Sequence, residues 1–418
     1  MKKFLIISIL LFSAGFIFGQ WIQQSSPTKR DLLDIKFFEN RGVIVGDSVI
    51  LTSNDSGQTW SSQYYTGYYI KCSFQNKDTV WAVGFTYPPM KNAIIKSTDG
   101  GQNWENVSIP EIDSIEGYCE SIFFSDKMHG WIGGGVTIHD TGYIFRTING
   151  GQTWERTNID SSVICAISFP DTLNGWACSL VRNIYKTTDG GKTWVLNNGE
   201  DYDLRDLFFT SKDSGWAVGG IASTQTIIRT TDGGKIWDIN EKNGSDLRKV
   251  WFSDSQNGWA AGGVPLDIIH TTDAGKSWLS QSQPISSHYI IFESIYMLDS
   301  QTGFVIADSG FILKTTNGGV LTAINIAPVL PNKIVLFQNY PNPFNPLTKI
   351  SYNLPEGNFI TLKIYDNLGR EIKTLVNKYQ DAGFHSVTFD GKALPSGIYY
   401  YKLQAGDFTQ TKKLVLLK

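Results

Sequence analysis

The 418-residue sequence has few cysteines, methionines, prolines and charged side chains. It contains 4 Cys, 4 Met and 14 Pro, and charged residues make up 18%. The cysteines show no Cys-x-x-Cys or other zinc-ligand spacing, so we expect neither a metal nor another cofactor. The formal net charge is −3, and no basic tail or acidic block is present, which argues against a nucleic-acid partner. Long amphipathic runs are also lacking, which argues against a helical bundle.

Glycine and aromatic residues are abundant instead. There are 41 Gly and 13 Trp, and 41% of the residues are hydrophobic, which is enough for a sizeable core. Glycine and aromatic residues without long helical periodicity are typical of strands joined by tight turns. The composition therefore predicts an all-β protein.

The N-terminus is typical of a secretory signal peptide over residues 1–19. Lys2 and Lys3 precede an apolar stretch, Phe4–Phe12, which is followed by small residues. The alternative is a retained membrane anchor, for which the stretch is short. No later segment reaches the ~18 apolar residues of a membrane helix, so we expect no transmembrane segment in the mature chain.

One pattern, Ser/Thr-x-Asp/Asn-x-Gly-x-x-Trp, recurs six times, and a seventh copy lacks the tryptophan. The copies follow one another at intervals of about 40–50 residues, which is typical of propeller blades or a solenoid. Hydroxyl and carboxylate oxygens at such spacing accept hydrogen bonds from turn amides, and glycine supplies a positive φ. We interpret the box as a folding device and expect no catalytic residue in it. The acid or amide positions are Asp55, Asp99, Asn149, Asp189, Asp232, Asp273 and Asn317.

A second motif alternates with the first and places an aromatic residue seven positions before a tryptophan, as in Phe209 and Trp216. It predicts two antiparallel strands joined by a tight turn. With an apolar third strand and the box that leads into a fourth, each repeat makes one four-stranded blade.

The boxes resemble those of the Asp-box, or BNR-type, β-propellers. Copies such as Thr230–Lys235 look like the subgroup that includes the photosystem II stability/assembly-factor family. The resemblance implies a seven-bladed β-propeller over residues 20–323. Because the last box lacks its tryptophan and fourth strand, we expect residues 20–24 to pair with the last blade and close the ring.

A different pattern follows a linker at residues 324–332. Residues 333–418 alternate short strands with turns, which predicts a small immunoglobulin-like β-sandwich. Three motifs within it look like the type A sorting domain of the type IX secretion system. They contain Tyr340, Pro341, Asn342, Pro343, Asp366, Gly369, Arg370, Gly397 and Tyr399. An ordinary adhesion domain is the alternative, and Arg370 has a second interpretation as the partner of a carboxylate inside the module.

The sorting-domain resemblance implies a secreted or cell-surface protein and names its partners. These are the type IX secretion machinery, a sortase-like peptidase that removes the module, and anionic lipopolysaccharide as an attachment point. The ligand of the propeller is a glycan or a protein that the sequence does not identify.

Unequal loop lengths locate a candidate binding face. Loops 84–93, 105–120 and 134–143 are the longest between their strands, and we expect them to gather on one side of one face. Exposed aromatic rings beside acids suit sugar rings and protein partners equally. Solvated loops without a ligand are the alternative. The candidate residues are Tyr64, Tyr65, Tyr87, Glu111, Tyr118, His139 and Asp140.

Four carboxylates lie near the start of the first predicted strand of their repeats, close to the predicted central channel. They are Asp34, Glu120, Asp206 and Glu293. Two of them would suit a glycosidase acid and base if 5–10 Å apart. The favoured interpretation is ion pairing with neighbours such as Arg205, Arg248 and Lys249.

Basic residues also precede most boxes. They are Lys96, Arg146, Lys186, Arg229, His270 and Lys314. Cross-strand pairing with residues such as Glu155 or Asp238 explains them simply, and a basic stripe for a partner is the alternative.

The cysteines and the function leave alternatives open. We interpret Cys72, Cys119, Cys165 and Cys178 as small buried residues, with a Cys165–Cys178 disulfide across one hairpin as the alternative. We expect a non-enzymatic binding propeller with no catalytic residues. A glycoside hydrolase and an assembly factor or chaperone are the other candidates.

Overall fold

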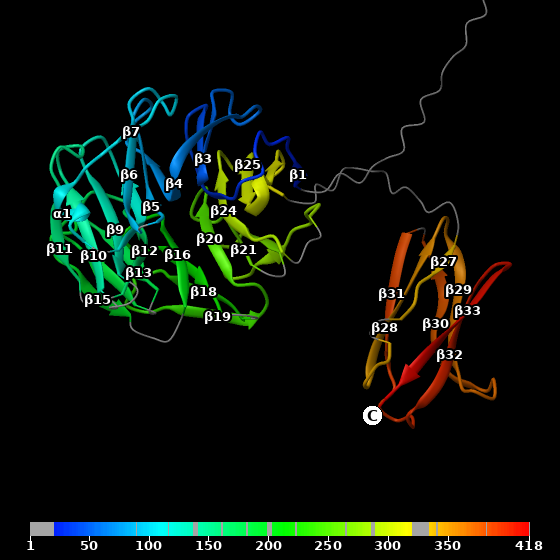
Figure 1. Ribbon diagram of the computed structural model, residues 1–418. Helices are drawn as coiled ribbons and strands as arrows, with labels where there is room; N and C mark the ends of the chain where they lie inside the picture. Colours follow the sequence, from blue (N-terminus) through cyan, green and yellow to red (C-terminus); the bar gives the residue numbers. More distant parts are fainter. Residues whose placement is uncertain are drawn as a thin grey trace, which may run out of the picture. The chain divides into compact units, whose positions relative to one another are not determined.

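The computed structural model describes residues 21–319 and 334–417. Short gaps interrupt both stretches, at 89, 116, 137–140, 160–161, 181–182, 199–202, 222–223, 264–265, 286–288, 340–341 and 382. The predicted leader, residues 1–19, and the predicted linker, residues 324–332, lie outside the described residues. The chain divides into two compact units, Met1–Leu321 and Thr322–Lys418 (Figure 1).

The described part of the first unit is built almost entirely from antiparallel sheets. One sheet has six strands: β2 (Leu32–Phe38), β3 (Arg41–Ser53), β4 (Ser61–Phe74), β5 (Val80–Thr86), β6 (Lys91–Ser97) and β7 (Glu105–Asn106). The one short α-helix described, α1 (Pro110–Asp113), precedes the next sheet.

Five further sheets of the described residues have four strands each. The first is β8 (Tyr118–Phe124), β9 (Gly130–Val136), β10 (Thr141–Thr147) and β11 (Glu155–Asn158). The second is β12 (Ile164–Ser168), β13 (Gly175–Ser179), β14 (Ile184–Thr187) and β15 (Val195–Asn198). The third is β16 (Leu204–Phe209), β17 (Gly215–Gly219), β18 (Thr224–Thr230) and β19 (Asp238–Asn243). The fourth is β20 (Leu247–Phe252), β21 (Gly258–Gly262), β22 (Asp267–Thr271) and β23 (Leu279–Ser280). The fifth is β24 (Phe292–Met297), β25 (Gly303–Ala307), β26 (Ile312–Thr315) and β1 (Ile22–Gln23).

The sheets form a closed ring. The strands β2, β4, β8, β12, β16, β20 and β24 contact one another in this order, and β24 contacts β2. Each therefore contributes to the inner wall of the ring. The wall matters for function because it sets the position of every side chain that faces the central channel.

Stacked aromatic rings join neighbouring sheets. The Trp131 ring on β9 stacks on the Phe169 ring after β12, with centroids 3.5 Å apart and planes 10° apart. The Trp131 indole Nε1 also donates a hydrogen bond to the Gly190 carbonyl in the next box, at 3.1 Å. Trp216 repeats the arrangement with Phe252 and the Ala274 carbonyl. The tryptophan of the second motif in one repeat thus stacks on the aromatic residue of the same motif in the next repeat, and this contact joins neighbouring sheets.

The boxes fold as the sequence predicts. In one of them the Thr187 hydroxyl donates to the Asp189 carboxylate at 2.8 Å, and the amides of Gly191 and Thr193 donate to Thr187 Oγ1 and Asp189 Oδ1 at 2.9 and 3.0 Å. Gly190 and Gly191 have φ values of 73° and 83°, which only glycine adopts without strain. Burial raises the pKa of Asp189, but the hydrogen bonds from Thr193 outweigh it and lower the pKa to about 2. The same hydroxyl-to-acceptor bond occurs at Asp55, Asp99, Asn149, Asp232, Asp273 and Asn317.

The N-terminal strand closes the ring, as predicted. β1 pairs with β26 through Ile22 opposite Lys314 and Gln23 opposite Leu313. The Trp21 side chain is fully buried, and its indole Nε1 donates to Gln281 Oε1 at 2.8 Å. The last sheet is therefore completed by the start of the chain.

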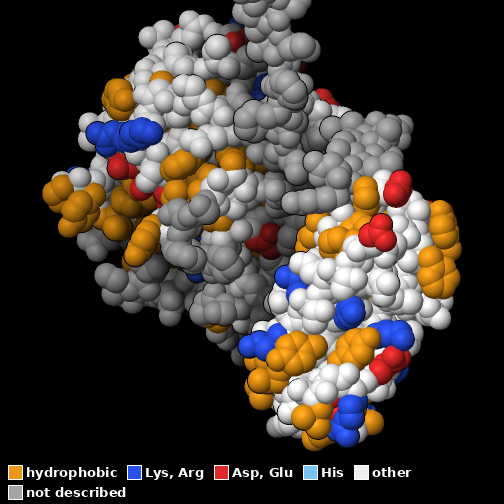
Figure 2. Space-filling view, turned by 90° about the vertical axis from the view of Figure 1, so that its right-hand side faces the viewer, with side chains coloured by type: hydrophobic (Ala, Val, Ile, Leu, Met, Phe, Trp, Pro, Cys, Tyr) orange, Lys and Arg blue, Asp and Glu red, His pale blue; other side chains and the backbone are white. Residues whose placement is uncertain are grey.

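The second unit consists of two sheets. One has β27 (Val335–Leu336), β28 (Leu347–Leu354) and β31 (Gly383–Asp390), and the other has β30 (Glu371–Gln380), β29 (Asn358–Tyr365), β32 (Gly397–Ala405) and β33 (Phe408–Leu416). Their inward side chains share one core, which includes Tyr352, Ile364 and Tyr401. Figure 2 shows hydrophobic side chains interspersed with Lys and Arg on the outer surface of this unit.

Candidate functional site

A repeated irregularity in the inner strands builds the site. Near the start of β2, β8, β12, β16, β20 and β24, and in the second half of the long strand β4, the register with the neighbouring strand shifts by one residue. A β-bulge of this kind leaves one residue unpaired and re-aims its side chain. The residues at the shifts are Leu33, Ile70, Glu120, Cys165, Arg205, Arg248 and Glu293, and we call them the bulge ring.

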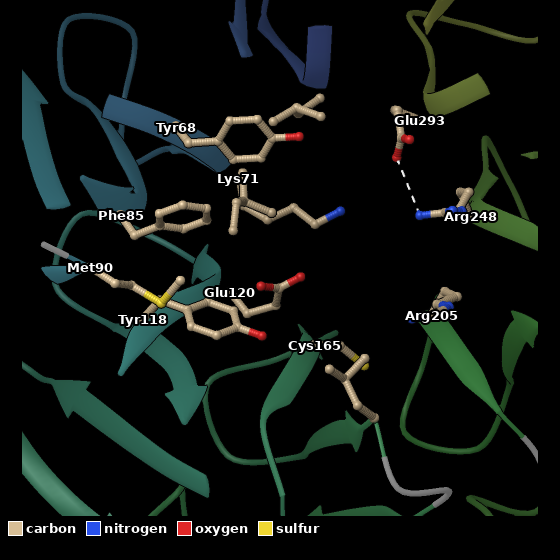
Figure 3. A pocket seen from close by; sticks show the side chains of 13 residues that line it. Tyr68, Lys71, Phe85, Met90, Tyr118, Glu120, Cys165, Arg205, Arg248 and Glu293 are labelled. Carbon is tan, nitrogen blue, oxygen red and sulfur yellow. Dashed lines mark ion pairs between the residues drawn. The ribbon is translucent and has the colours of Figure 1, made fainter. Parts of the chain in front are cut away.

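All members of the bulge ring line one cavity of about 400 Å³ at the mouth of the channel (Figure 3). Aromatic side chains form one wall of this cavity. The rings of Tyr68 and Phe85 stack with centroids 5.2 Å apart, and Tyr118 meets Phe85 edge-on at 5.7 Å. Met90 and Leu180 extend the apolar surface.

Charged groups occupy the opposite wall. Arg248 Nη1 lies 3.8 Å from Glu293 Oε2, and Arg248 Nε lies 3.4 Å from Asp246 Oδ2. The Nε of Arg205 is buried without a hydrogen-bond partner among the described residues. Figure 3 shows the Lys71 ammonium pointing into the cavity between the two walls. A buried donor without an acceptor is costly, so this wall favours a ligand that brings an acceptor or a negative charge.

The carboxyl group of Glu120 has a pKa close to neutral pH. Burial raises its pKa to about 7, with Glu293 adding to the effect and Lys71 and Arg205 opposing it. Burial also raises the pKa of Glu293. Near pH 7 the mouth therefore holds a carboxyl group that is partly protonated, and its net charge becomes more positive as the pH falls.

A second layer of charges lies deeper in the channel and contains two ion pairs. Lys249 Nζ lies 3.1 Å from Asp206 Oδ1, and the Val250 amide donates to Asp206 Oδ2 at 3.0 Å. Lys36 Nζ lies 3.4 Å from Asp34 Oδ1, which also accepts the Ser294 hydroxyl at 2.9 Å. These contacts, with the Arg248–Glu293 pair at the mouth, bear out the predicted ion pairing for Asp34, Asp206 and Glu293, whereas for Glu120 it stays a prediction.

The pKa of Asp34 shows why this layer is structural. Burial raises the pKa, but Lys36, Lys249 and Lys71 outweigh it and hold the pKa well below its usual range. A carboxylate that stays ionised among lysines is a poor proton donor.

Aromatic side chains line the channel beyond this layer. The ring centroids of Phe208 and Trp251 are 4.8 Å apart, and those of Trp251 and Tyr296 are 4.3 Å apart. Lys36 Nζ lies 5.8 Å from the centroids of both Trp251 and Tyr296. The cavity at this depth measures only about 60 Å³, so the channel is much wider at its mouth.

The long loops meet at the aromatic wall, in part as predicted. The Asn92 amide donates to the carbonyls of Ile112 and Ile115, and Tyr143 donates to Asn92 Oδ1. Loops 84–93 and 105–120 therefore lie side by side. Residues 137–140 of the loop at 134–143 lie outside the described residues.

The predicted ligand-binding residues are spread over this face and beyond. Tyr118 lines the cavity, whereas Tyr64, Tyr65, Tyr87 and Glu111 do not. Tyr64 and Tyr87 are 60% and 76% exposed, Tyr65 donates to Gln63, and Glu111 is exposed on α1. His139 and Asp140 lie outside the described residues. Ligand binding by all these residues stays a prediction.

Sequence reasoning did not place Arg205, Arg248 and Lys71 together as a binding wall, although a signal for it exists. In each repeat, the second motif begins with an aromatic residue or, in the last repeat, with Met297. Every member of the bulge ring lies four residues before this position, as Arg205 lies before Phe209 and Glu293 before Met297. Aligning the repeats on that position yields the ring.

The basic residues before the boxes have local partners. Arg146 pairs with Glu155 at 2.8 Å and Arg229 with Asp238 at 3.0 Å, as predicted. Lys96 and Lys186 lie over the rings of Trp81 and Trp176. The His270 ring stacks on Trp259 and Lys314 lies over Phe304. Contacts with side chains on neighbouring strands therefore explain the basic residues before the boxes, and these residues need no binding partner to explain them.

In the second unit, the motif residues hold turns. The Asp366 carboxylate accepts the amides of Leu368 and Arg370 at 2.9 Å, and Arg370 Nε donates to Asp366 Oδ2 at 2.7 Å. This confirms the interpretation that Arg370 pairs with a carboxylate inside the module. Asn342 Oδ1 accepts the Val415 amide, and the Tyr399 hydroxyl donates to the Pro395 carbonyl. Tyr340 and Pro341 lie outside the described residues.

In the part of the chain that the structure describes, no group of three or more His, Cys, Asp or Glu side chains is placed to hold a metal ion. Among the described helices, none is long and apolar enough to cross a membrane.

Two family models match the chain. The model described as photosynthesis system II assembly factor YCF48 matches residues 63–200 and 198–327, more than half of the 418 residues. The model described as secretion system C-terminal sorting domain matches residues 338–417. None of the curated proteins compared with the chain matches it.

Solved structures share the architecture of the first unit. "YCF48 bound to D1 peptide" is 20% identical, with a TM-score of 0.57, over 72% of this chain and 96% of that one. YCF48 from Cyanidioschyzon merolae is 22% identical, with a TM-score of 0.55, over 71% and 98%. The GH74 xyloglucanase from Xanthomonas campestris is 12% identical, with a TM-score of 0.57, over 80% of this chain and 59% of that one. At these identities the likeness shows the fold alone, a BNR-type propeller.

Proposed function

Because the chain belongs to the photosynthesis system II assembly factor YCF48 family and ends in a secretion system C-terminal sorting domain, we propose that it is an exported propeller that binds an extended protein segment at the mouth of its channel. The sorting domain indicates export through the type IX secretion system, to the outer surface or as a secreted protein. The machinery of that system is therefore one partner. Removal of the domain by a sortase-like peptidase and attachment to anionic lipopolysaccharide are parts of the proposal.

We infer that the propeller has seven blades. The six-stranded sheet counts as two of them, because β3 and β4 each change partner midway. β3 pairs with β2 up to Gly46 and with β4 from Asp47, and β4 pairs with β5 from Tyr68. The sandwich of the second unit fits an immunoglobulin-like arrangement.

The observation that carries the proposed binding role is the asymmetry of the bulge ring. One wall offers stacked rings at Tyr68, Phe85 and Tyr118, and the other offers Arg205 with an unpaired Nε beside Arg248. Neighbouring side chains of an extended peptide are a few ångströms apart. One peptide can therefore place an apolar side chain against the aromatic wall and a carboxylate against the arginine wall of the cavity. The peptide in the structure of YCF48 with D1 supports this ligand class for a propeller of the same fold.

Selection from a display library of random linear peptides tests the proposal. The full chain should enrich peptides that combine an aromatic or apolar residue with an acidic group. Arg205→Ala should weaken their binding at least tenfold, whereas Arg156→Ala, an exposed arginine on the outermost strand β11, should leave it unchanged. Enrichment of no peptide, or equal binding by the Arg205→Ala variant, would contradict it.

A second candidate function, glycoside hydrolysis, is favoured by one observation. Glu120 and Glu293 line the same cavity, and burial raises the pKa of Glu120 to about 7, as a general acid requires. Incubation with a polysaccharide panel and measurement of new reducing ends tests it. Release by the wild type that Glu120→Gln abolishes would replace the binding proposal with an enzymatic one.

A further inference from the structure

Two of the four cysteines face each other, and the other two do not. All four are buried. Cys72 Sγ lies 3.9 Å from Asp34 Oδ2, and Cys119 Sγ lies 3.3 Å from Asn92 Oδ1. The sulfur atoms of Cys165 and Cys178, in contrast, lie 3.1 Å from each other. Cys165 Sγ also lies 3.3 Å from the Cys178 carbonyl oxygen, but this pair, unlike Cys72 and Cys119, brings two sulfur atoms into contact.

The bulge in β12 produces this contact. Ile164 pairs with Ser179 and Ala166 with Cys178, so Cys165 is the extra residue. At a bulge two residues oppose one, so Cys165 and Ala166 together face Cys178. Ala166 is the residue directly opposite Cys178, and Cys165 is its immediate neighbour in β12. The 3.1 Å separation of the two sulfur atoms shows that the Cys165 side chain nevertheless reaches across to Cys178. The local backbone therefore suits a bond without rearrangement of the strands.

We propose that Cys165 and Cys178 form a disulfide in the exported protein. The two thiols lose two protons and two electrons, and one S–S bond forms between Cys165 Sγ and Cys178 Sγ. The oxidant is a disulfide of a thiol oxidoreductase in the exporting compartment, or glutathione disulfide in vitro, which is reduced to two thiols. The sulfur atoms must approach by about 1 Å from their present contact to reach a bonded distance.

Burial determines when the bond forms. Cys165 is 3% exposed and Cys178 is fully buried, in a cluster with Leu204, Leu207 and Phe209. Burial, with Cys165 beside it, also raises the pKa of the Cys178 thiol, which makes the thiolate scarce in the folded state. The exchange therefore takes place while the chain folds, before the next sheet covers the hairpin. Once the sheet has packed, the same burial shields the bond from reductants.

The bond has a consequence for the channel mouth. Cys165 belongs to the bulge ring, between Glu120 and Arg205 in the order of the strands. A disulfide to β13 holds the bulge of β12 in place and leaves no free thiol in the cavity. Its effect on stability comes mainly through the unfolded chain, in which it closes a short loop.

Thiol counting on the full chain tests the proposal. The protein is exported by its host or refolded with glutathione and glutathione disulfide, unfolded without reductant, treated with iodoacetamide, and digested. We expect two alkylated cysteines, Cys72 and Cys119, and one linked pair of peptides that contains Cys165 and Cys178. Four alkylated cysteines, or a linked pair that includes Cys72 or Cys119, would overturn it.

Serine variants supply a second readout. Dithiothreitol should lower the melting temperature of the wild type by several degrees only after the protein has been unfolded and refolded in its presence. Cys165→Ser and Cys178→Ser should melt at the lower temperature with or without dithiothreitol, and Cys119→Ser should keep the sensitivity of the wild type. If these variants fail to fold, the alkylation of the wild type decides alone. A Cys165→Ser variant that still responds to dithiothreitol would contradict the bond.

Discussion

Arg248 Nη1 lies 3.8 Å from Glu293 Oε2, and both side chains occupy bulge positions of adjacent inner strands. The pair is partly exposed to the cavity, so it holds the arginine weakly. Under the proposed function, a ligand carboxylate would compete with Glu293 for the same guanidinium group. The proposal therefore implies that the carboxylates of the channel mouth, as well as its arginines, set its affinity for anions.

Glu293→Gln should strengthen the binding of acidic peptides. Loss of the carboxylate frees Arg248 and removes a like charge, which together should tighten binding roughly fivefold, or about 1 kcal/mol. Fluorescence anisotropy with a labelled peptide from the library measures the change. Glu155→Gln is the matched control, because Glu155 also pairs with an arginine but lies on the outer strand β11. Weaker binding by Glu293→Gln would show that the ligand needs this carboxylate.

The pH dependence of binding should follow Glu120. Its pKa is raised to about 7, so the group loses its proton as the pH rises through 7, and the new negative charge opposes an anionic ligand. Affinity for an acidic peptide should fall between about pH 6 and 8 in the wild type and stay level in Glu120→Gln. Glu155→Gln, on the outer strand β11, should behave as the wild type. Parallel curves for the wild type and Glu120→Gln would assign the pH dependence to another group.

Glu120 should also make the free energy of unfolding depend on pH. The sign should be opposite to that of a salt-bridged carboxylate, whose pKa is lowered by folding. A raised pKa in the folded state means that the folded protein holds a proton that the unfolded chain releases between about pH 4.5 and 7. The free energy of unfolding should therefore fall over this range by about 1–2 kcal/mol, allowing for solvent in the channel. Urea unfolding at several pH values measures it, and Glu120→Gln should remove the slope. An unfolding free energy that rises over this range would contradict the raised pKa.

The box acid should be replaceable by asparagine but not by alanine. Asn149 accepts the Thr153 amide at 3.0 Å in its own box, as Asp189 accepts the Thr193 amide. Asp189→Asn should keep the stability of the wild type near pH 7, whereas Asp189→Ala should lose about 1 kcal/mol, as when a helix loses a capping side chain. Thermal melting compares them. Equal melting of all three proteins would show that the turn does not depend on the side chain.

Closure of the ring should depend on Trp21. Its ring is fully buried and its indole Nε1 reaches Gln281 on the preceding sheet. Trp21→Ala should cost about 3–5 kcal/mol, as is typical of a buried tryptophan, and lower the melting temperature accordingly. Leu279→Ala, which removes a side chain that is 74% exposed, should change stability by less than about 0.5 kcal/mol. An unchanged melting temperature for Trp21→Ala would mean that the ring closes without this strand.

Export should require the second unit with its Asp366 turn. The Asp366 carboxylate holds the amides of Leu368 and Arg370, so Asp366→Ala should loosen the turn and reduce the exported fraction several-fold. Removal of residues 333–418 should abolish export, and Lys373→Ala on the neighbouring strand should leave it intact. Fractionation of the host into periplasm, surface and medium measures this. Surface delivery of the truncated chain would contradict the role of the domain.

Much of the fold was predictable because each repeat contains the local sequence signals for its own strands and turns. The spacing from Phe209 to Trp216 predicts a hairpin, the boxes predict the turns, and Trp21 predicts the closing strand. Each of these signals is local in the sequence or repeats at a fixed period. The physical reason is that every sheet packs against its neighbour through the same kinds of side-chain contact, so the same residues recur in each repeat.

The channel mouth was less predictable, because a β-bulge leaves no signal in the pattern of hydrophobic residues. Cys165, Arg205 and Glu293 differ in chemistry, so their shared position emerges from the sequence only when the repeats are aligned on the aromatic or methionine residue four positions later. Loop length pointed instead to residues such as Tyr87, which is exposed away from the cavity lining. Tyr118 belongs to both sets because the long loop at 105–120 ends where the inner strand begins.

Hydrogen–deuterium exchange of the full chain, with and without a peptide selected from the library, tests the central claim most directly. The account predicts slower exchange at the starts of β8, β16, β20 and β24, around Glu120, Arg205, Arg248 and Glu293, and in the loop that holds Met90. The boxes should exchange as before. Protection confined to the boxes or to the outer strands, with none at the bulge ring, would contradict the claim that the channel mouth binds the ligand.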